Sequence, residues 1–249
     1  MTATIVSPFD AVPFMARKHA LFLDFDGTLA PLQDDPDAVA LPRDGAATLL
    51  SLHHALSGAL VLISGRDIRD LSQRTPVDLW RAGGHGLEIC KPGEQPSATR
   101  ETVPTGVMAS VEAITGPLEG VRIEDKGPVL AVHFRQNPSA EQELLSALTV
   151  VANETDGYKA QHGKMVIELK PLRANKGAAL AAMMQDPPFA GRIPIMVGDD
   201  TTDEDAMRAA TDAGGYGIKV GAGETCAEYR LADTKAVWEW LRRVVNEHA

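Results

Sequence analysis

Three short apolar runs, each ending abruptly at polar residues, constrain the fold of this chain more than any other feature. The runs are Leu21–Leu23, Ala59–Ile63 and Ile193–Val197. Apolar runs of this length are typical of strands that are buried on both faces of a parallel sheet. Stretches with apolar residues near helical spacing lie between them, as in Arg43–Leu56. The alternation predicts an α/β fold with a Rossmann-like parallel sheet.

Two acids, Asp24 and Asp26, follow the first run in the segment LFLDFDGTL. Ligands of open α/β sheets bind at the carboxyl ends of the strands. Residues i and i+2 of an extended segment point the same way, so both carboxylates could face one site. For a single Asp here, a turn or a helix N-cap would be the favoured interpretation. Two acids followed by Gly27-Thr28 favour a metal-bound nucleophile and a second acid for proton transfer.

Further polar residues fall at equivalent places along the chain. Ser64 ends the second predicted strand, Lys176 opens a helix, and Asp199 and Asp200 end a later strand. Phosphoryl transfer needs positive charge nearby, because the transferred group carries several negative oxygens. A hard cation such as Mg²⁺ suits oxygen ligands, and we assign Asp24 and Asp199 to it, with Asp200 as a supporting ligand residue.

Each of these pieces has a simpler structural interpretation when it is taken alone. Ser64 could belong to a turn, and Lys176 could be a solvated residue at a helix start. In GDDTTDED (Gly198–Asp205), Thr202 or Asp203 could cap the following helix, so the role of Asp203 stays open. The order of the four pieces together is a much stronger signal than any one of them.

The pattern changes between Ser64 and Lys176. Residues 91–105 are rich in Pro, Gly, Ser and Thr, which indicates a boundary or an exposed connection. A helix over Ser139–Asn153 then separates two predicted hairpins. Their strands are Val121–Glu124 with Val129–Arg135, and Tyr158–Gln161 with Met165–Lys170. We therefore expect a small α+β domain over residues 105–170, inserted into a core domain formed by residues 1–104 and 171–249.

The four polar pieces resemble, in order, the four motifs of the haloacid-dehalogenase superfamily, whose members are mostly Mg²⁺-dependent phosphatases. The inserted block lies where that superfamily's type-2 cap domain lies. Further segments, covering nearly the whole chain, resemble the trehalose-6-phosphate phosphatases. They are ISGR (63–66), GGHGLEI (83–89), EDKGPVLAVHFR (124–135), GKMVIELKP (163–171), NKG (175–177) and GDDTTDED (198–205).

The resemblance implies roles for the core residues. Asp24 is expected to be the nucleophile and a Mg²⁺ ligand, and Asp199 a further ligand. Asp26 is expected to be the acid/base, with its backbone carbonyl also on the metal. The residues expected to bind the phosphate or the substrate here are Ser64, Gly65, Arg66 and Lys176.

Four charged residues of the inserted domain match positions that contact the sugar in that family: Glu124, Lys126, Arg135 and Glu168. A disaccharide offers many hydroxyls, which charged groups can bind with strong hydrogen bonds. From the residues alone, ion pairs across a solvated sheet face explain them equally well. The resemblance favours sugar binding. His85 and His133 could also reach the site, but a single histidine is more often a packed or surface residue.

The resemblance implies hydrolysis of trehalose 6-phosphate to trehalose and phosphate through an aspartyl-phosphate, the last step of trehalose biosynthesis. One alternative is a phosphatase of the same superfamily that acts on another sugar phosphate, such as sucrose phosphate or a mannosyl phosphoglycerate. Another is a catalytically silent binding domain. The intact set of catalytic residues argues against the silent domain.

Composition limits the partners. A net charge of −10 disfavours nucleic acid, and no apolar run approaches membrane-spanning length. Cys90 and Cys226 lack metal-ligand spacing and indicate a reducing compartment. The N-terminal 20 residues, broken by prolines, do not resemble a secretory signal. We expect a cytoplasmic protein whose partner is a small sugar phosphate; its oligomeric state is open, with a monomer favoured.

Overall fold

The computed structural model describes residues 4–5, 14, 17–33, 35–163 and 165–248 of the 249-residue chain. Most of the N-terminal segment, on which the argument against a secretory signal rests, therefore lies outside the described residues. None of the described helices is both long and apolar enough to cross a lipid bilayer.

The chain divides into two compact units, residues 1–96 with 175–249, and residues 97–174. The predicted insertion, 105–170, starts eight residues later and ends four residues earlier than the second unit. The difference at the first boundary has a physical reason. Val103 packs against the hydrophobic core of the second unit, and the Arg100 guanidinium donates to the Asp125 carbonyl at 2.7 Å.

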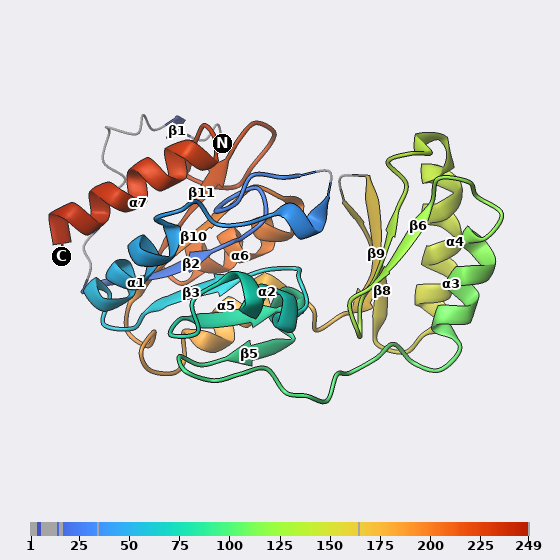
Figure 1. Ribbon diagram of the computed structural model, residues 1–249, viewed down its shortest axis with the longest axis horizontal. Helices are drawn as coiled ribbons and strands as arrows, with labels where there is room; N and C mark the ends of the chain where they lie inside the picture. The colour runs from blue at the N-terminus through green and yellow to red at the C-terminus, as the bar shows by residue number, and fades with distance from the viewer. Residues whose placement is uncertain (1–3, 6–13, 15–16, 34, 164, 249) are drawn as a thin grey trace. The chain divides into compact units, whose positions relative to one another are not determined.

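In the described part of the first unit, eight strands form one sheet in the order β1-β12-β11-β10-β2-β3-β4-β5 (Figure 1). Neighbouring strands are parallel except β4 and β5. The strands are β1 (Thr4–Ile5), β2 (His19–Leu23), β3 (Leu60–Ile63), β4 (Trp80–Gly83), β5 (Glu88–Cys90), β10 (Ile193–Gly198), β11 (Tyr216–Val220) and β12 (Tyr229–Leu231). The predicted α/β fold with a parallel sheet is confirmed. The prediction missed β1, β5 and β12, which are too short to show a periodicity.

Among the described helices of this unit, α1 packs against α7 and α5 against α6, whereas α2 packs against β4 and β5. They are α1 (Gly45–Ala55), α2 (Ile68–Arg74), α5 (Lys176–Met183), α6 (Thr201–Asp212) and α7 (Thr234–His248), with short 3₁₀ turns at Pro36–Ala38 and Gly84–Gly86. Trp238 of α7 is buried, and its indole N–H donates to the Leu29 carbonyl at 2.7 Å. The terminal helix thus holds the loop that follows Asp26.

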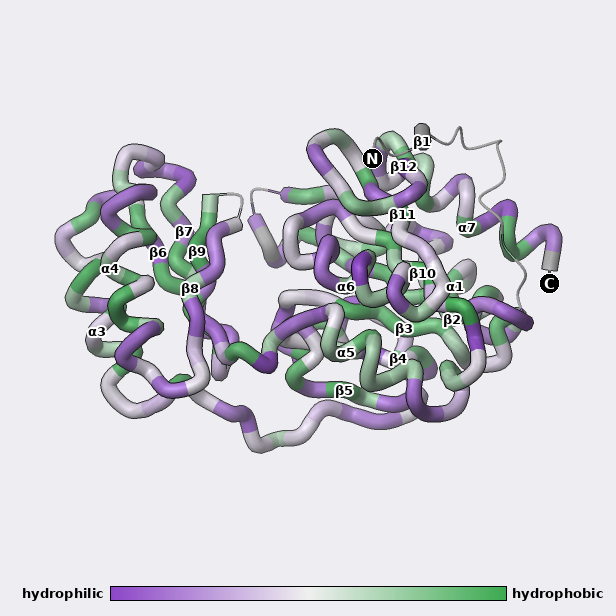
Figure 2. Tube along the Cα trace, turned by 180° about the vertical axis from the view of Figure 1, so that it is seen from behind, coloured by the Kyte–Doolittle hydropathy of each residue, from purple (hydrophilic) through white to green (hydrophobic). Residues whose placement is uncertain are grey.

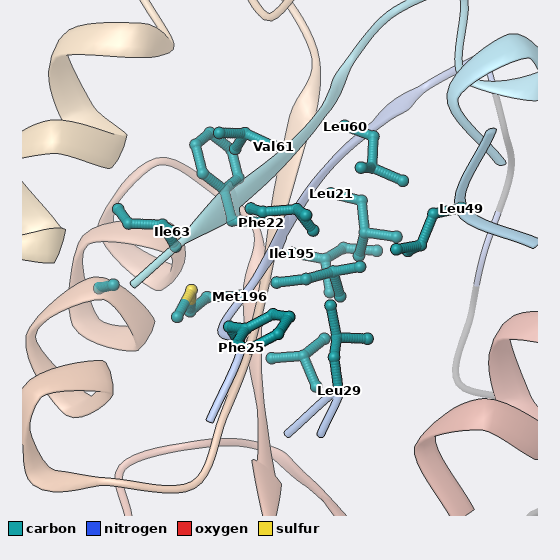
Figure 3. Close-up of a cluster of buried hydrophobic side chains, with 14 of the residues drawn as sticks. Leu21, Phe22, Phe25, Leu29, Leu49, Leu60, Val61, Ile63, Ile195 and Met196 are labelled. Carbon is teal, nitrogen blue, oxygen red and sulfur yellow. The ribbon is translucent and has the colours of Figure 1, made fainter. Parts of the chain in front are cut away.

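The core of the first unit lies on its central strands. Every residue of β2 is buried, and side chains of β2, β3 and β10 pack with Phe25 and Leu29 of the following loop (Figure 3). In Figure 2 β2 and β3 are mostly hydrophobic, whereas the outer side of α6 is hydrophilic. This buried sheet provides a rigid base for the residues that follow each strand.

In the described part of the second unit, four strands form an antiparallel sheet in the order β6-β7-β9-β8, together with two longer helices and the 3₁₀ turn Pro138–Ala140 (Figure 1). Its elements are α3 (Val107–Thr115), β6 (Arg122–Asp125), β7 (Leu130–His133), α4 (Glu141–Glu154), β8 (Tyr158–Gly163) and β9 (Val166–Pro171). The buried side chains of β7 and β9 form its core together with those of α3 and α4. The prediction extended β7 to Arg135, which is wrong: the strand ends at His133, and Arg135 lies exposed in the following turn.

We expect Phe22→Ala to lower the free energy of unfolding by about 3–5 kcal/mol, because it deletes a fully buried ring. The ring packs against Phe189 with centroids 5.5 Å apart. Leu32→Ala, at a side chain that is 55% exposed, is the matched control and should change stability by less than about 0.5 kcal/mol. Urea unfolding of both variants checks this. Equal losses would contradict the assigned core.

Candidate active site

The candidate site begins where β2 and β10 end side by side. The two strands are parallel neighbours in which Leu23 pairs with Val197, and the Asp24 N–H donates to the Val197 carbonyl at 2.9 Å. This register carries Asp24 and Asp199 to the same edge of the sheet. Together with Asp203 of α6, each offers a carboxylate oxygen, and these oxygens lie within 4.8 Å of one another. We call these three residues the carboxylate cluster.

Lys176 neutralises part of this cluster. Its side chain is 3% exposed, and its ammonium donates to Asp24 Oδ1 and to Asp203 Oδ1, each at 2.6 Å. The start of α5 is fixed by Asn175, whose side-chain oxygen accepts the Ala178 N–H at 2.9 Å. The Asn175 amide in turn donates to Asp205 of α6 at 2.9 Å. Helix α6 therefore sets the position from which Lys176 reaches the cluster.

Asp200 and Asp203, two acids of the segment GDDTTDED, make different contacts. Asp203 is fully buried, and its Oδ2 accepts the N–H groups of Asp199 and Asp200, each at 3.0 Å. Asp200 is the N-cap of α6, and its carboxylate accepts the Thr201 N–H at 2.7 Å. The free N–H groups of a helix start explain this use of Asp200. The structure thus places Asp203 in the carboxylate cluster and Asp200 at its edge as a cap.

Two glycines allow the carboxylates to pack this closely. A Cβ on Gly27 would lie 2.3 Å from Asp199 Oδ2, and a Cβ on Gly198 would lie 2.3 Å from Asp203 Cγ. Gly27 also has a φ of +77°, a conformation that side chains with a Cβ rarely adopt. Backbone without side chains therefore forms part of the wall around the cluster.

The cluster carries an excess of negative charge. Three carboxylates face one ammonium, so the fully ionised group has a charge of −3 + 1 = −2. Burial and the neighbouring charge of Asp203 raise the pKa of Asp24 well above its ordinary value, and they raise the pKa of Asp199 to about 7. Burial alone would lower the pKa of Lys176, but the charges of Asp203 and Asp24 outweigh it and raise that pKa.

This donor set fits a hard divalent cation. Asp199 Oδ1 is buried and has no hydrogen-bond partner within the described part of the chain. Leaving a buried carboxylate oxygen unpaired is costly, and a cation would satisfy it. Carboxylate oxygens are also the ligands that Mg²⁺ and Ca²⁺ take in proteins. The geometry therefore supports a cation at Asp24 and Asp199.

Asp26 is not one of the three residues of the carboxylate cluster, and its side chain pairs with Arg66. The Arg66 guanidinium donates to both carboxylate oxygens of Asp26, at 2.7 and 2.6 Å, and to Asp70 at 2.6 Å. Asp70 also accepts from Arg74 at 2.8 Å. Arg66, which was predicted to bind substrate, is thus engaged by two carboxylates. Its guanidinium fixes the Asp26 side chain at the carboxyl end of β2.

Ser64 and Gly65 lie at the same sheet edge, because β3 pairs with β2 in parallel. Ser64 is buried, and its hydroxyl accepts the Arg66 N–H at 3.1 Å. His85, whose role the sequence left open, is also buried, and its backbone N–H donates to the Ser64 carbonyl at 2.8 Å. A Cβ on Gly65 would lie 2.8 Å from the His85 ring. His85 has a φ of +60°, a strained conformation that often marks a functional position.

In the second unit, three of the four predicted sugar-binding residues lie together. Lys126 is 3.8 Å from Glu124 and 3.5 Å from Glu168, and His133 donates to Glu124 at 2.8 Å. Burial raises the pKa of Glu124, but the His133 hydrogen bond and the charge of Lys126 outweigh it and lower that pKa. The cross-strand register places Glu124, Ala131 and Glu168 side by side. The fourth, Arg135, is exposed in the turn after β7.

One further residue at the site was missed by the sequence analysis. Lys219 of β11 is buried, and its ammonium donates to the Asp199 backbone carbonyl at 2.5 Å. The available signal was a lysine in the otherwise apolar strand YGIKV. Its position beside Asp199 depends on strand order, which a single sequence does not give.

A family model described as trehalose-phosphatase matches residues 22–235. The Escherichia coli (strain K12) protein named trehalose-6-phosphate phosphatase is 34% identical over 245 residues, which cover 97% of this chain and 92% of that protein. The chain belongs to the trehalose-phosphatase family. The resemblance described from the sequence is confirmed.

Solved structures of other proteins have a fold similar to that of this member of the trehalose-phosphatase family. The C-terminal domain of C. albicans trehalose-6-phosphate phosphatase aligns with a TM-score of 0.81 at 22% identity and covers 92% of both chains. A haloacid dehalogenase-like hydrolase from Bacteroides thetaiotaomicron aligns with a TM-score of 0.66 at 16% identity, over 91% of this chain and 100% of that one. The chain therefore shares the fold of these two proteins.

The raised pKa of Asp199 predicts a pH-dependent stability. The folded chain holds this proton up to about pH 7, whereas the ordinary value is 3.8. Unfolding therefore releases a proton between these pH values, and the contribution of Asp199 to stability falls as the pH rises. Without metal, the wild type should lose stability relative to Asp199→Asn between pH 5 and pH 8, measured by urea unfolding. Added Mg²⁺ should reverse the loss in the wild type alone. A difference that stays constant with pH would contradict the buried site.

Proposed function

We propose that this protein is a phosphoric monoester hydrolase that converts trehalose 6-phosphate to trehalose and phosphate, the last step of trehalose biosynthesis. The observation that carries the proposal is the buried carboxylate cluster with Lys176 at the carboxyl end of a parallel sheet. Support for the substrate comes from the family and from the name of the Escherichia coli relative.

Asp24 is the proposed nucleophile. Its carboxylate attacks phosphorus, the bond to the sugar oxygen breaks, and an aspartyl-phosphate forms that water then hydrolyses. Two anions repel each other, so positive charge must accompany the attack. The Lys176 ammonium, 2.6 Å from Asp24 Oδ1, supplies part of that charge from inside the protein. Ser64, with Gly65 and Arg66 after it, is proposed to hold the phosphate oxygens at the end of β3.

Asp26 is the proposed acid and base. It gives a proton to the leaving sugar oxygen and later takes one from the attacking water. In the structure its carboxylate is paired with Arg66 through two hydrogen bonds. Arg66 is held in turn by Asp70, so the Asp26 side chain has a defined position before substrate arrives. For the proton transfer itself, Asp26 must exchange part of this pairing for the substrate oxygen.

Mg²⁺ is the proposed cofactor, held by Asp24, Asp199 and the backbone carbonyl of Asp26. Asp200 is proposed to support this ligand set. When bound, the cation supplies positive charge that offsets both the carboxylates and the phosphate oxygens. The net charge of the cluster and the unpaired Asp199 Oδ1 favour such a cation.

The charged face of the second unit is proposed to bind the sugar hydroxyls through Glu124, Lys126, Arg135 and Glu168. The first two and Glu168 already form a connected group, which presents both donors and acceptors. Such groups discriminate strongly between substrates when a hydroxyl is missing or displaced. We also propose a cytoplasmic location, which is supported by two free cysteines, Cys90 and Cys226.

A panel of sugar phosphates tests the proposed substrate. Phosphate release should be fastest with trehalose 6-phosphate, and it should fall when Mg²⁺ is chelated. Sucrose phosphate, mannosyl phosphoglycerate and glucose 6-phosphate serve as comparison substrates. Equal kcat/KM values for all of them would rule out the specific assignment while leaving a phosphatase.

Asp24→Asn should abolish turnover and leave the protein folded. The amide keeps the size of the side chain but removes the nucleophile, so we expect a loss of at least about 10³-fold in kcat. Asp186→Asn, at an exposed acid of the same unit, is the matched control and should retain activity. Circular dichroism verifies folding of both variants. Substantial turnover by Asp24→Asn would eliminate the aspartyl-phosphate route.

A further inference from the structure

Lys219 is a buried lysine that the proposed mechanism does not use. It lies on β11, where the parallel register pairs it with Gly198, one residue before Asp199. Its side chain is 6% exposed. Lysine is almost never buried unless its ammonium is paired, because burying an isolated charge is costly. The contacts of this ammonium therefore indicate what holds it in place.

The ammonium of Lys219 joins two parts of the site. It donates to the backbone carbonyl of Asp199 at 2.5 Å and lies 3.5 Å from Glu204 Oε1. Glu204 is 12% exposed, and its other oxygen accepts the Cys226 N–H at 2.8 Å. Glu204 is thus fixed both by its place in α6 and by the loop before β12. Lys219 is held between this carboxylate and the peptide that follows Asp199.

We propose that Lys219 is a positioning residue of the cation site: it orients the peptide of Asp199 so that the carboxylate faces Asp24. The inference rests on the proposed function, because it assumes that Asp199 holds a cation. Asp203 holds the peptides on both sides of Asp199, since its carboxylate accepts the N–H of Asp199 and that of Asp200, each at 3.0 Å. Lys219 and Asp203 therefore fix both polar groups of the backbone at the residue that carries the ligand.

The direction in which cation affinity changes when Lys219 is replaced distinguishes a positioning role from a simple charge effect. A lysine next to a cation site repels the cation, so removal of its charge alone would tighten cation binding. Removal of its hydrogen bond instead lets the Asp199 peptide turn, which weakens binding. Outer partners of metal ligands typically change metal affinity by about 10–100-fold when they are mutated. We infer that the cation affinity lost with the orientation of Asp199 exceeds the affinity gained from lower repulsion.

The test measures binding of Mn²⁺ to the purified full chain by electron paramagnetic resonance, with Mg²⁺ as competitor. Lys219→Met should weaken Mn²⁺ binding by about 10-fold or more relative to the wild type. Lys219→Arg, which keeps the charge and the donors, should restore most of the affinity. Lys235→Met removes the same charge at a lysine whose side chain is 83% exposed, and it should leave the affinity unchanged.

A second variant covers the case in which Lys219→Met does not fold. Glu204→Gln leaves Lys219 in place but removes its ionic partner, and we expect a smaller but measurable loss of Mn²⁺ affinity. Equal or tighter Mn²⁺ binding in folded Lys219→Met, or unchanged binding in Glu204→Gln, would overturn the assignment.

The wild type distinguishes failure of this inference from failure of the proposed function. If the wild type binds Mn²⁺ and releases phosphate from trehalose 6-phosphate, an unaffected Lys219→Met overturns the role of Lys219 alone. If the wild type binds no Mn²⁺, both the cation site and the role of Lys219 are overturned. A purely structural lysine would lower the melting temperature without changing Mn²⁺ affinity below it, and that result would also refute the positioning role.

Discussion

Burial of three carboxylates around one lysine is the interaction on which the rest of this structure depends. Asp24, Asp199 and Asp203 approach one another inside the protein, and Lys176 balances only part of their charge. Such a group is unstable by itself, because desolvation and mutual repulsion both disfavour the ionised state. Its persistence requires a rigid surrounding and favours a cation. The cluster therefore destabilises the folded protein at the place where the proposed chemistry needs charge.

The fold supplies that rigidity through neighbouring strands. Asp24 and Asp199 come from β2 and β10, which lie next to each other in the buried sheet although they are far apart in the sequence. The start of α5 brings Lys176 to them, while the first turn of α6 brings Asp203. Helix α6 also anchors Asn175 through Asp205, so one helix controls both Asp203 and Lys176. Small displacements of α6 would therefore disturb the whole cluster.

The sequence was sufficient for the parts that depend on local pattern. Short apolar runs that end in Asp24, Ser64 and Gly198-Asp199 were enough to predict the parallel sheet and the sheet edge at which the polar residues gather. The sequence could not decide which acid of GDDTTDED caps α6 and which joins the carboxylate cluster. Asp200 and Asp203 are chemically alike, and their roles depend on the capping geometry at the start of α6. Lys219 was missed because its neighbour Asp199 is brought to it by strand order. Arg66 was expected at the substrate, and its pairing with Asp26, 40 residues away in the sequence, is a tertiary contact that local pattern does not give.

The most direct test is a crystal structure of the full chain grown with Mn²⁺, in which anomalous scattering locates the metal without reference to any prior assignment. Our prediction is one strong anomalous peak bonded to carboxylate oxygens of Asp24 and Asp199, with Lys176 still paired to Asp203. An anomalous map with no peak between these two carboxylates, from crystals in which Mn²⁺ binds elsewhere or not at all, would contradict it.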